Sequence, residues 1–184
     1  MIAPYKAPLK VGIGGLGAIG LELARTTGAR INVPSGAVLG LDAVRAAGLG
    51  NIKQVTIVTR KPPAGLVGAP HIEKQNIDLD SVDQPLKVFE GSAKEGVKAF
   101  PANVNVAAAL GLAGIGPDRT WLEVWADPLV NRNIHSITVE PDSARCELKI
   151  ENVPTEENPR TGRIVVLSVL AALKRLVDPL TVGT

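Results

Sequence analysis

A glycine-rich turn near the start of the chain has the spacing of a dinucleotide-binding loop. Gly15, Gly17 and Gly20 form the pattern GxGxxG, between an expected strand over 9–13 and an expected helix over 21–25. The first glycine permits a tight turn, the second lets a pyrophosphate approach the backbone, and the third lets helix and strand pack closely. The pattern predicts a nucleotide cofactor. A plain structural turn is the alternative, because the chain holds 19 glycines.

The imidazole of His135 is a second group that could do chemistry. Strand alternation places it on one face with Asn133, Ile137 and Val139. An imidazole with a pKa near its ordinary value can accept or release protons at neutral pH. In the oxidation of an amine, such a group accepts a proton as hydride leaves, or activates the water that attacks the imine. The alternative is a core histidine with satisfied hydrogen bonds.

Two asparagines begin an otherwise apolar stretch of small residues that predicts a helix over 103–113. Asparagine caps helix N-termini well, and this role suits Asn103. Asn105 lies in or near the first turn and is not needed as a cap. It is therefore a candidate for contact with a ligand.

The totals place the chain among soluble globular proteins. It has 184 residues, of which 45% are hydrophobic and 21% charged, with a net charge of +2. This balance favours neither nucleic acid nor an anionic membrane as a partner. No apolar run approaches the roughly 18 residues that span a bilayer. The single cysteine, Cys146, excludes an internal disulfide and is expected in the core, and we expect a cytoplasmic protein.

The pattern along the chain predicts an α/β protein: a truncated Rossmann-like segment, then an α+β domain with a mainly antiparallel sheet flanked by helices. Ser92 is the expected N-cap of a helix, with Glu95 completing a capping box. The segment 61–84 is expected to be a long irregular loop with His71 on its surface. Strands are expected over 30–33, 52–60, 87–89, 121–126, 134–140 and 145–151, and helices over 39–47, 93–100, 103–113 and 164–176.

The front of the chain is too short for a complete dinucleotide-binding domain. Such a domain needs an acidic residue at the end of a second strand, about 20 residues after the glycines, to hold the ribose. Asp42 stands near that distance but lies in a predicted helix, and few residues separate Gly20 from Arg30. We therefore expect three parts: a remnant of the dinucleotide-binding domain over 1–36, a substrate and dimerisation domain over 37–162, and a helix with a tail over 163–184.

The order of several longer motifs resembles the L-aspartate dehydrogenase family. After the glycine turn, the motifs are TGARINVPSGA at 27–37, TRKPP at 59–63, FEGSA at 89–93, FPANVNVAA at 100–108, ADP at 126–128, NIH at 133–135 and ENPRT at 157–161. The chain departs from the family at Arg25, which runs directly into the Thr-Gly-Ala-Arg segment as if most of the cofactor domain were deleted. Relatives of homoserine dehydrogenase or dihydrodipicolinate reductase are an alternative, against which the motifs at 133–135 and 158–161 argue.

The resemblance implies the NAD- or NADP-dependent oxidation of L-aspartate to iminoaspartate, which yields oxaloacetate and ammonia or feeds NAD biosynthesis. It also implies that His135 is catalytic. The residues it implies for cofactor binding are Gly15, Gly17, Ala18, Ile19, Gly20, Ala37 and Asn105.

The two carboxylates of such a substrate require cations or N–H donors. The candidates are Arg60, Lys61, Asn103, Arg132 and Arg160, although a solvated surface position is the more common explanation for each charged one. The two histidines stand far apart without supporting ligands, so no metal site is expected.

The segment 121–126 has apolar groups on both faces, because Trp121 and Trp125 alternate with Leu122 and Val124. A sheet covered by helices on one side and by a second subunit on the other would explain this pattern, and we expect a homodimer. The alternative to a working enzyme is an inactive remnant that acts only as an oligomerising or carboxylate-binding module.

Overall fold

The computed structural model describes residue 26 and residues 31–102, 104–156 and 162–183. The chain divides into two compact units, Met1–Val33 and Pro34–Thr184. The glycine turn at 15–20 and the elements expected around it lie outside the described residues, as do Asn103 and Arg160.

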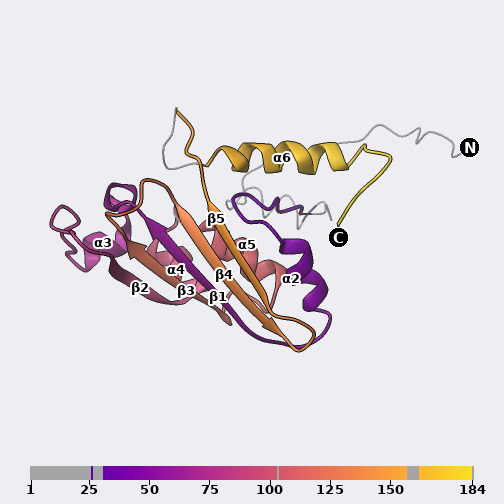
Figure 1. Ribbon diagram of the computed structural model, residues 1–184, viewed down its shortest axis with the longest axis horizontal. Helices are drawn as coiled ribbons and strands as arrows, with labels where there is room; N and C mark the ends of the chain where they lie inside the picture. Colours follow the sequence, from indigo (N-terminus) through magenta and orange to yellow (C-terminus); the bar gives the residue numbers. More distant parts are fainter. Residues whose placement is uncertain (1–25, 27–30, 103, 157–161, 184) are drawn as a thin grey trace, which may run out of the picture. The chain divides into compact units, whose positions relative to one another are not determined.

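A five-stranded mixed sheet forms the centre of this unit (Figure 1). The strands run in the order β2-β3-β1-β4-β5. The central pair β1 and β3 is parallel, and the other three pairs are antiparallel. The expected α/β class with a mainly antiparallel sheet is therefore confirmed. The strands are β1 (Ile52–Lys61), β2 (Leu86–Ser92), β3 (Thr120–Ala126), β4 (Ile134–Pro141) and β5 (Cys146–Glu151).

The helices begin and end close to the predicted positions. The capping box at Ser92 is confirmed: its hydroxyl accepts a hydrogen bond from the Glu95 backbone N–H at 3.2 Å, while the Glu95 carboxylate accepts one from the Ser92 N–H at 2.9 Å. The helices are α2 (Leu41–Ala47), a 3₁₀ helix η1 (Pro63–Leu66), α3 (Pro70–Lys74), α4 (Ala93–Ala99), α5 (Asn105–Ala113) and α6 (Arg163–Arg175).

Two expectations about the connections are wrong. Ile31–Val33 form no strand, and the segment 61–84 is not wholly irregular, because η1 and α3 lie within it, each with a proline in its first turn.

The structure also differs from the prediction that His71 lies on the surface. Its side chain is half-buried, with Nε2 3.0 Å from the Val88 carbonyl oxygen. Its ring centroid lies 5.4 Å from that of Phe89 and 5.3 Å from that of Phe100. The first turn of α3 carries it into this aromatic cluster, which the spacing of residues in the loop could not reveal.

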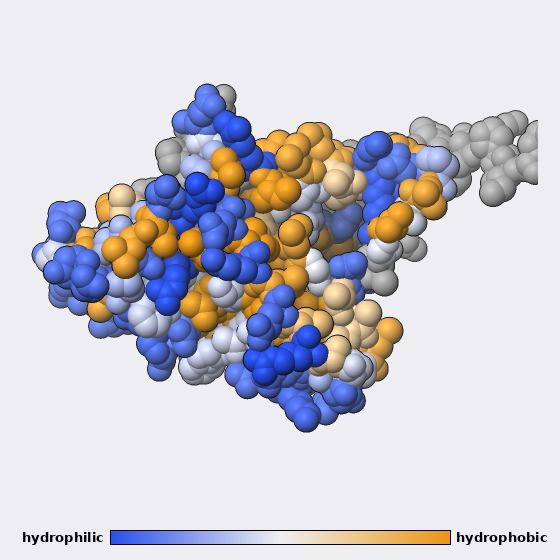
Figure 2. Space-filling view, viewed as in Figure 1, coloured by the Kyte–Doolittle hydropathy of each residue, from blue (hydrophilic) through white to orange (hydrophobic). Residues whose placement is uncertain are grey.

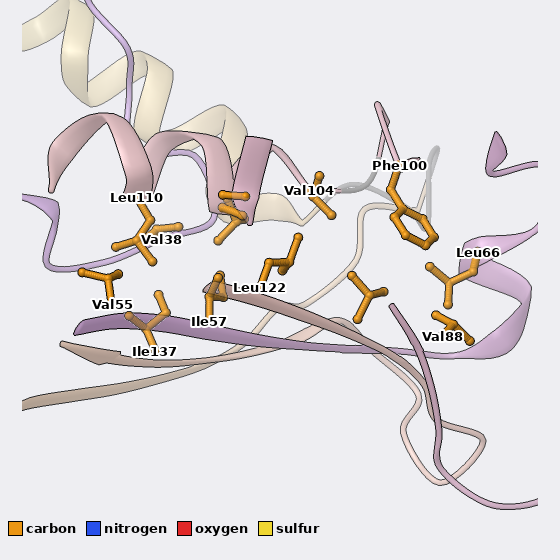
Figure 3. Packing of buried hydrophobic residues seen from close by; sticks show 14 of the residues in the cluster. Val38, Val55, Ile57, Leu66, Val88, Phe100, Val104, Leu110, Leu122 and Ile137 are labelled. Carbon is orange, nitrogen blue, oxygen red and sulfur yellow. The ribbon is translucent and has the colours of Figure 1, made fainter. Parts of the chain in front are cut away.

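The core lies between one face of the sheet and the helices α4 and α5. Figure 3 shows Val55, Ile57 and Ile137 on the strands, with Leu110 of α5 above them. Gly96 of α4 makes a close approach possible here, because a Cβ at this position would lie 2.3 Å from Cδ2 of Leu122. Burying each aliphatic side chain in this layer contributes about 1.5–3 kcal/mol to folding.

Two apolar surfaces remain exposed. Trp121 on the other face of the sheet is 44% exposed. Helix α6 buries none of its residues, and its Val166, Leu167 and Leu170 are exposed. Figure 2 shows apolar residues on the surface over this helix. Within the described residues, no helix is long and apolar enough to cross a membrane.

Candidate active site

Buried polar groups are concentrated at one end of the sheet. Of the polar or charged residues that are buried in the described part of the chain, Thr120 lies elsewhere and the others lie where β1 and β3 end and where β4 begins. These others are Thr59, Lys61, Asp127, His135 and Asn152. A buried polar group costs free energy unless it is paired, so this cluster needs a physical explanation.

The strand register places four of these groups, Thr59, His135, Lys61 and Asn152, in two neighbouring rows across β1, β4 and β5. Thr59 is opposite His135, which is opposite Ile150. One step further along the same face, the Asn152 backbone N–H donates to the Asn133 carbonyl at 2.9 Å, and continuation of the β1–β4 register brings Lys61 to this row. Because alternate residues share a face, the side chains of both rows point to the side of the sheet that carries the core.

His135 is the central titratable group of this cluster. It is only 3% exposed, and its Nδ1 lies 3.1 Å from the Thr59 hydroxyl, the hydrogen-bond partner of His135 within the described residues. Burial, and to a smaller extent the charge of Lys61, lower the pKa of His135 from 6.5 to about 4. The imidazole is therefore neutral at physiological pH and can accept a proton.

Lys61 and Arg60 are adjacent in sequence but serve different sides of β1. Lys61 is 4% exposed and acts electrostatically on His135. Arg60 points the other way, where its guanidinium lies 4.8 Å over the Trp125 ring and Nη1 donates to Asp127 Oδ2 at 3.1 Å. Asp127 Oδ1 also accepts a hydrogen bond from the Leu129 N–H, and the Asp127 N–H donates to the Lys61 carbonyl at 2.8 Å. Together with the ion pair, these bonds hold the turn after β3 in place.

The remaining predicted site residues that are described lie outside this cluster of buried polar side chains. Arg132 is half-buried and donates from Nε to Asn131 Oδ1 at 3.1 Å. Asn105 is exposed at the first position of α5, and no side chain caps that helix. Ala37 is half-buried in a turn that is closed by the hydrogen bond from the Val38 N–H to the Ser35 carbonyl at 3.1 Å.

Sequence reasoning missed Thr59, Asp127 and Asn152. Thr59 is a threonine that follows Val55 and Ile57 on one face of β1, and this change from apolar to polar was a usable signal. Asn152 is a polar residue that continues the apolar face of β5. Its side-chain amide is buried, and neither Nδ2 nor Oδ1 has a hydrogen-bond partner in the part of the chain that the structure describes. An unsatisfied buried group of this kind costs about 1–3 kcal/mol, and this cost could only be seen once the strands were placed.

Comparison with known proteins identifies the family of this arrangement. Residues 42–176 match the family described as "Aspartate dehydrogenase, C-terminal". The chain belongs to this family, whose match covers β1 to β5 and therefore all five buried polar residues of the cluster.

Individual relatives carry the same name. The chain is 56% identical to an L-aspartate dehydrogenase of Bradyrhizobium diazoefficiens over 97% of its own length and 64% of the relative's. It is 53% identical to L-aspartate dehydrogenase 3 of Bordetella bronchiseptica, over 89% and 61% of the two chains. The crystal structure of aspartate dehydrogenase from Thermotoga maritima superposes with a TM-score of 0.68 at 31% identity, over 89% and 60%. The chain thus spans about three-fifths of the length of these relatives.

Proposed function

We propose that this chain takes part in the nicotinamide-dependent oxidation of L-aspartate, with His135 as its proton-transfer group. The observation that carries the proposal is a neutral imidazole, buried beside a cationic lysine and held by the Thr59 hydroxyl. This arrangement lies in the part of the chain that matches the aspartate dehydrogenase family. The names of the relatives supply the substrate.

The buried cluster suits the proton transfers of amine oxidation. With Nδ1 engaged by Thr59, Nε2 of His135 is the nitrogen that faces a substrate, and it takes a proton from the amine or from the water that attacks the imine. Lys61 supplies positive charge for a substrate carboxylate. A carboxylate bound at Lys61 would offset the charge that lowers the pKa of His135, which makes the imidazole a stronger base when substrate is present.

A nicotinamide cofactor fits the described residues that the family resemblance assigns to it. Asn105 is the first residue of α5, and it is exposed and does not cap the helix. Ala37, with the small turn that holds it, allows close backbone approach. When bound, NAD or NADP supplies the hydride acceptor. Asn105 and Ala37 would contact it; the other residues that the resemblance assigns to the cofactor, Gly15, Gly17, Ala18, Ile19 and Gly20, lie outside the described residues.

A direct assay tests the proposal. The purified chain is mixed with L-aspartate and either NAD or NADP, and reduced nicotinamide is followed by its near-ultraviolet absorbance. We expect turnover, and a loss on the order of a hundredfold or more in His135→Gln. The matched control is His71→Gln, which changes the other histidine of the chain. His71 lies in the aromatic cluster, and this variant should retain activity. A folded wild-type chain without turnover, beside an active full-length relative, would contradict the proposal and favour a non-enzymatic module.

The same proposal includes a homodimer and a three-part chain. The sheet face opposite the core carries Trp121, which is 44% exposed, and Trp125, which is half-buried. Covering this face with a second copy would bury apolar surface that a monomer leaves in water. We expect Trp121→Glu to weaken self-association in analytical ultracentrifugation.

The proposed parts of the chain are 1–36, 37–162 and 163–184, with 37–162 providing both the site and the interface.

A further inference from the structure

The unexplained feature of the site is the Asn152 side chain. It is 4% exposed, and both its amide nitrogen and its amide oxygen are buried without a hydrogen-bond partner among the described residues. Folded proteins pair almost all such groups, and an exception points to a function or a missing ligand. The fold itself therefore gives no reason for an amide, rather than an apolar side chain, at this position.

The position of Asn152 is fixed by backbone contacts on two sides. Its N–H donates to the Asn133 carbonyl at 2.9 Å, which extends the β4–β5 ladder by one residue. On the other side Gly162 packs against it, because a Cβ on Gly162 would lie 2.9 Å from Asn152 Oδ1. The hydrogen bond from the Arg163 N–H to the Val153 carbonyl at 2.9 Å holds these two segments together. The amide is thus held in place before any ligand arrives.

We propose that Asn152 is a specificity residue that binds the side-chain carboxylate of the amino-acid substrate through its Nδ2 group. This inference rests on the proposed function. Asn152 and Lys61 lie in the same row on opposite sides of β4, so that about 10 Å of sheet separates their backbones. His135 lies on the strand between them, one row away.

This placement assigns one carboxylate to each side. The β1–β4 register places Lys61 one row from His135 on the same face, and we assign to it the carboxylate attached to the reacting carbon. The second carboxylate of a short dicarboxylic amino acid then extends toward β5, where Asn152 donates to it. An uncharged amide is adequate here because a hydrogen bond to a charged acceptor is stronger than one between neutral groups. A monocarboxylic amino acid such as L-alanine has no group that reaches Asn152.

Calorimetric titration of the whole chain, with and without NAD, tests this assignment. L-aspartate and L-alanine are titrated into the wild type, Asn152→Leu, and the control Asn51→Leu, which changes an exposed asparagine beyond the start of β1. We expect Asn152→Leu to weaken L-aspartate binding at least tenfold and to leave L-alanine binding unchanged. Its melting temperature should equal or exceed that of the wild type, because leucine removes an unpaired buried amide. Asn152→Asp, which is nearly isosteric, should weaken L-aspartate binding further by repulsion.

Three results would overturn the inference. Unchanged L-aspartate affinity in Asn152→Leu removes Asn152 from the binding site. Equal loss of affinity for both amino acids, together with a lower melting temperature, shows that the residue only supports the fold. If the wild type binds no L-aspartate at all, the proposed function fails and this inference fails with it, whereas the first two results leave the proposed function standing.

Discussion

The two ends of one sheet face differ in chemistry but not in burial. At one end, Val55, Ile57 and Val139 are buried against α5 and one another. At the other end, Thr59 and His135 are buried to nearly the same extent. The first end contributes stability through apolar contact. The second end removes polar groups from the water that would otherwise solvate them, which costs free energy. A polar end of this kind costs stability, which the apolar end offsets, and this cost is expected if the polar end serves the proposed function.

The apolar end should respond most strongly to truncation. Ile57→Ala removes a fully buried side chain from beneath α5 and should lower the free energy of unfolding by about 2–5 kcal/mol, through lost transfer energy and the cavity left behind. Urea denaturation measures the change. Val58→Ala, on the half-buried opposite face, is the control and should cost about 1 kcal/mol or less. Equal costs at the two positions would mean that the core does not lie on the assigned face.

Acid should destabilise the polar end specifically. The folded-state pKa of His135, about 4, lies below its ordinary value of 6.5. The unfolded chain therefore binds the proton first, and stability is lost as the pH falls from about 6.5 to about 4, by about 3 kcal/mol in total. Comparing urea denaturation of the wild type and His135→Leu across this range isolates the effect. Parallel pH profiles for the two proteins would contradict a buried, neutral His135.

Removing the hydroxyl of Thr59 should affect catalysis more than folding. Thr59→Val keeps the shape of the side chain but deletes the partner of His135 Nδ1, so the imidazole loses the hydrogen bond that holds its orientation. We expect kcat to fall roughly tenfold, which corresponds to about one hydrogen bond. Thr56→Val, which faces the other side of β1, serves as the control. A loss that appears only in KM would place Thr59 at the substrate rather than behind the histidine.

A change in the helix layer should alter stability without touching the polar end. Ser92→Ala removes the N-cap of α4, which packs over β2 and β3, and should cost about 1 kcal/mol. Ser81→Ala, at an exposed turn, should cost little. Thermal unfolding measures both, and a change in L-aspartate affinity in Ser92→Ala would show that the two ends are coupled.

Local patterns in the sequence determined most of the elements of this protein. Period-two alternation gave the strands around Ile57, Trp121 and His135, and the Ser92–Glu95 pair gave the start of α4, because these signals act between residues close in the chain. The same alternation placed His135 on a core-facing strand. It could not show Asn152 as a site residue, since an isolated asparagine after a strand has many local explanations.

Tertiary structure decided which distant groups meet. The register between β1 and β4 brings Thr59 to His135, although 76 residues of sequence separate them. The same register brings Lys61 close enough to lower the pKa of His135. Burial then makes the imidazole neutral and leaves the Asn152 amide unpaired, since both effects depend on the water that packing removes. No short-range pattern in the sequence encodes this removal of water. For this reason the sequence could place His135 on a core-facing strand, but only the tertiary structure showed which groups surround it.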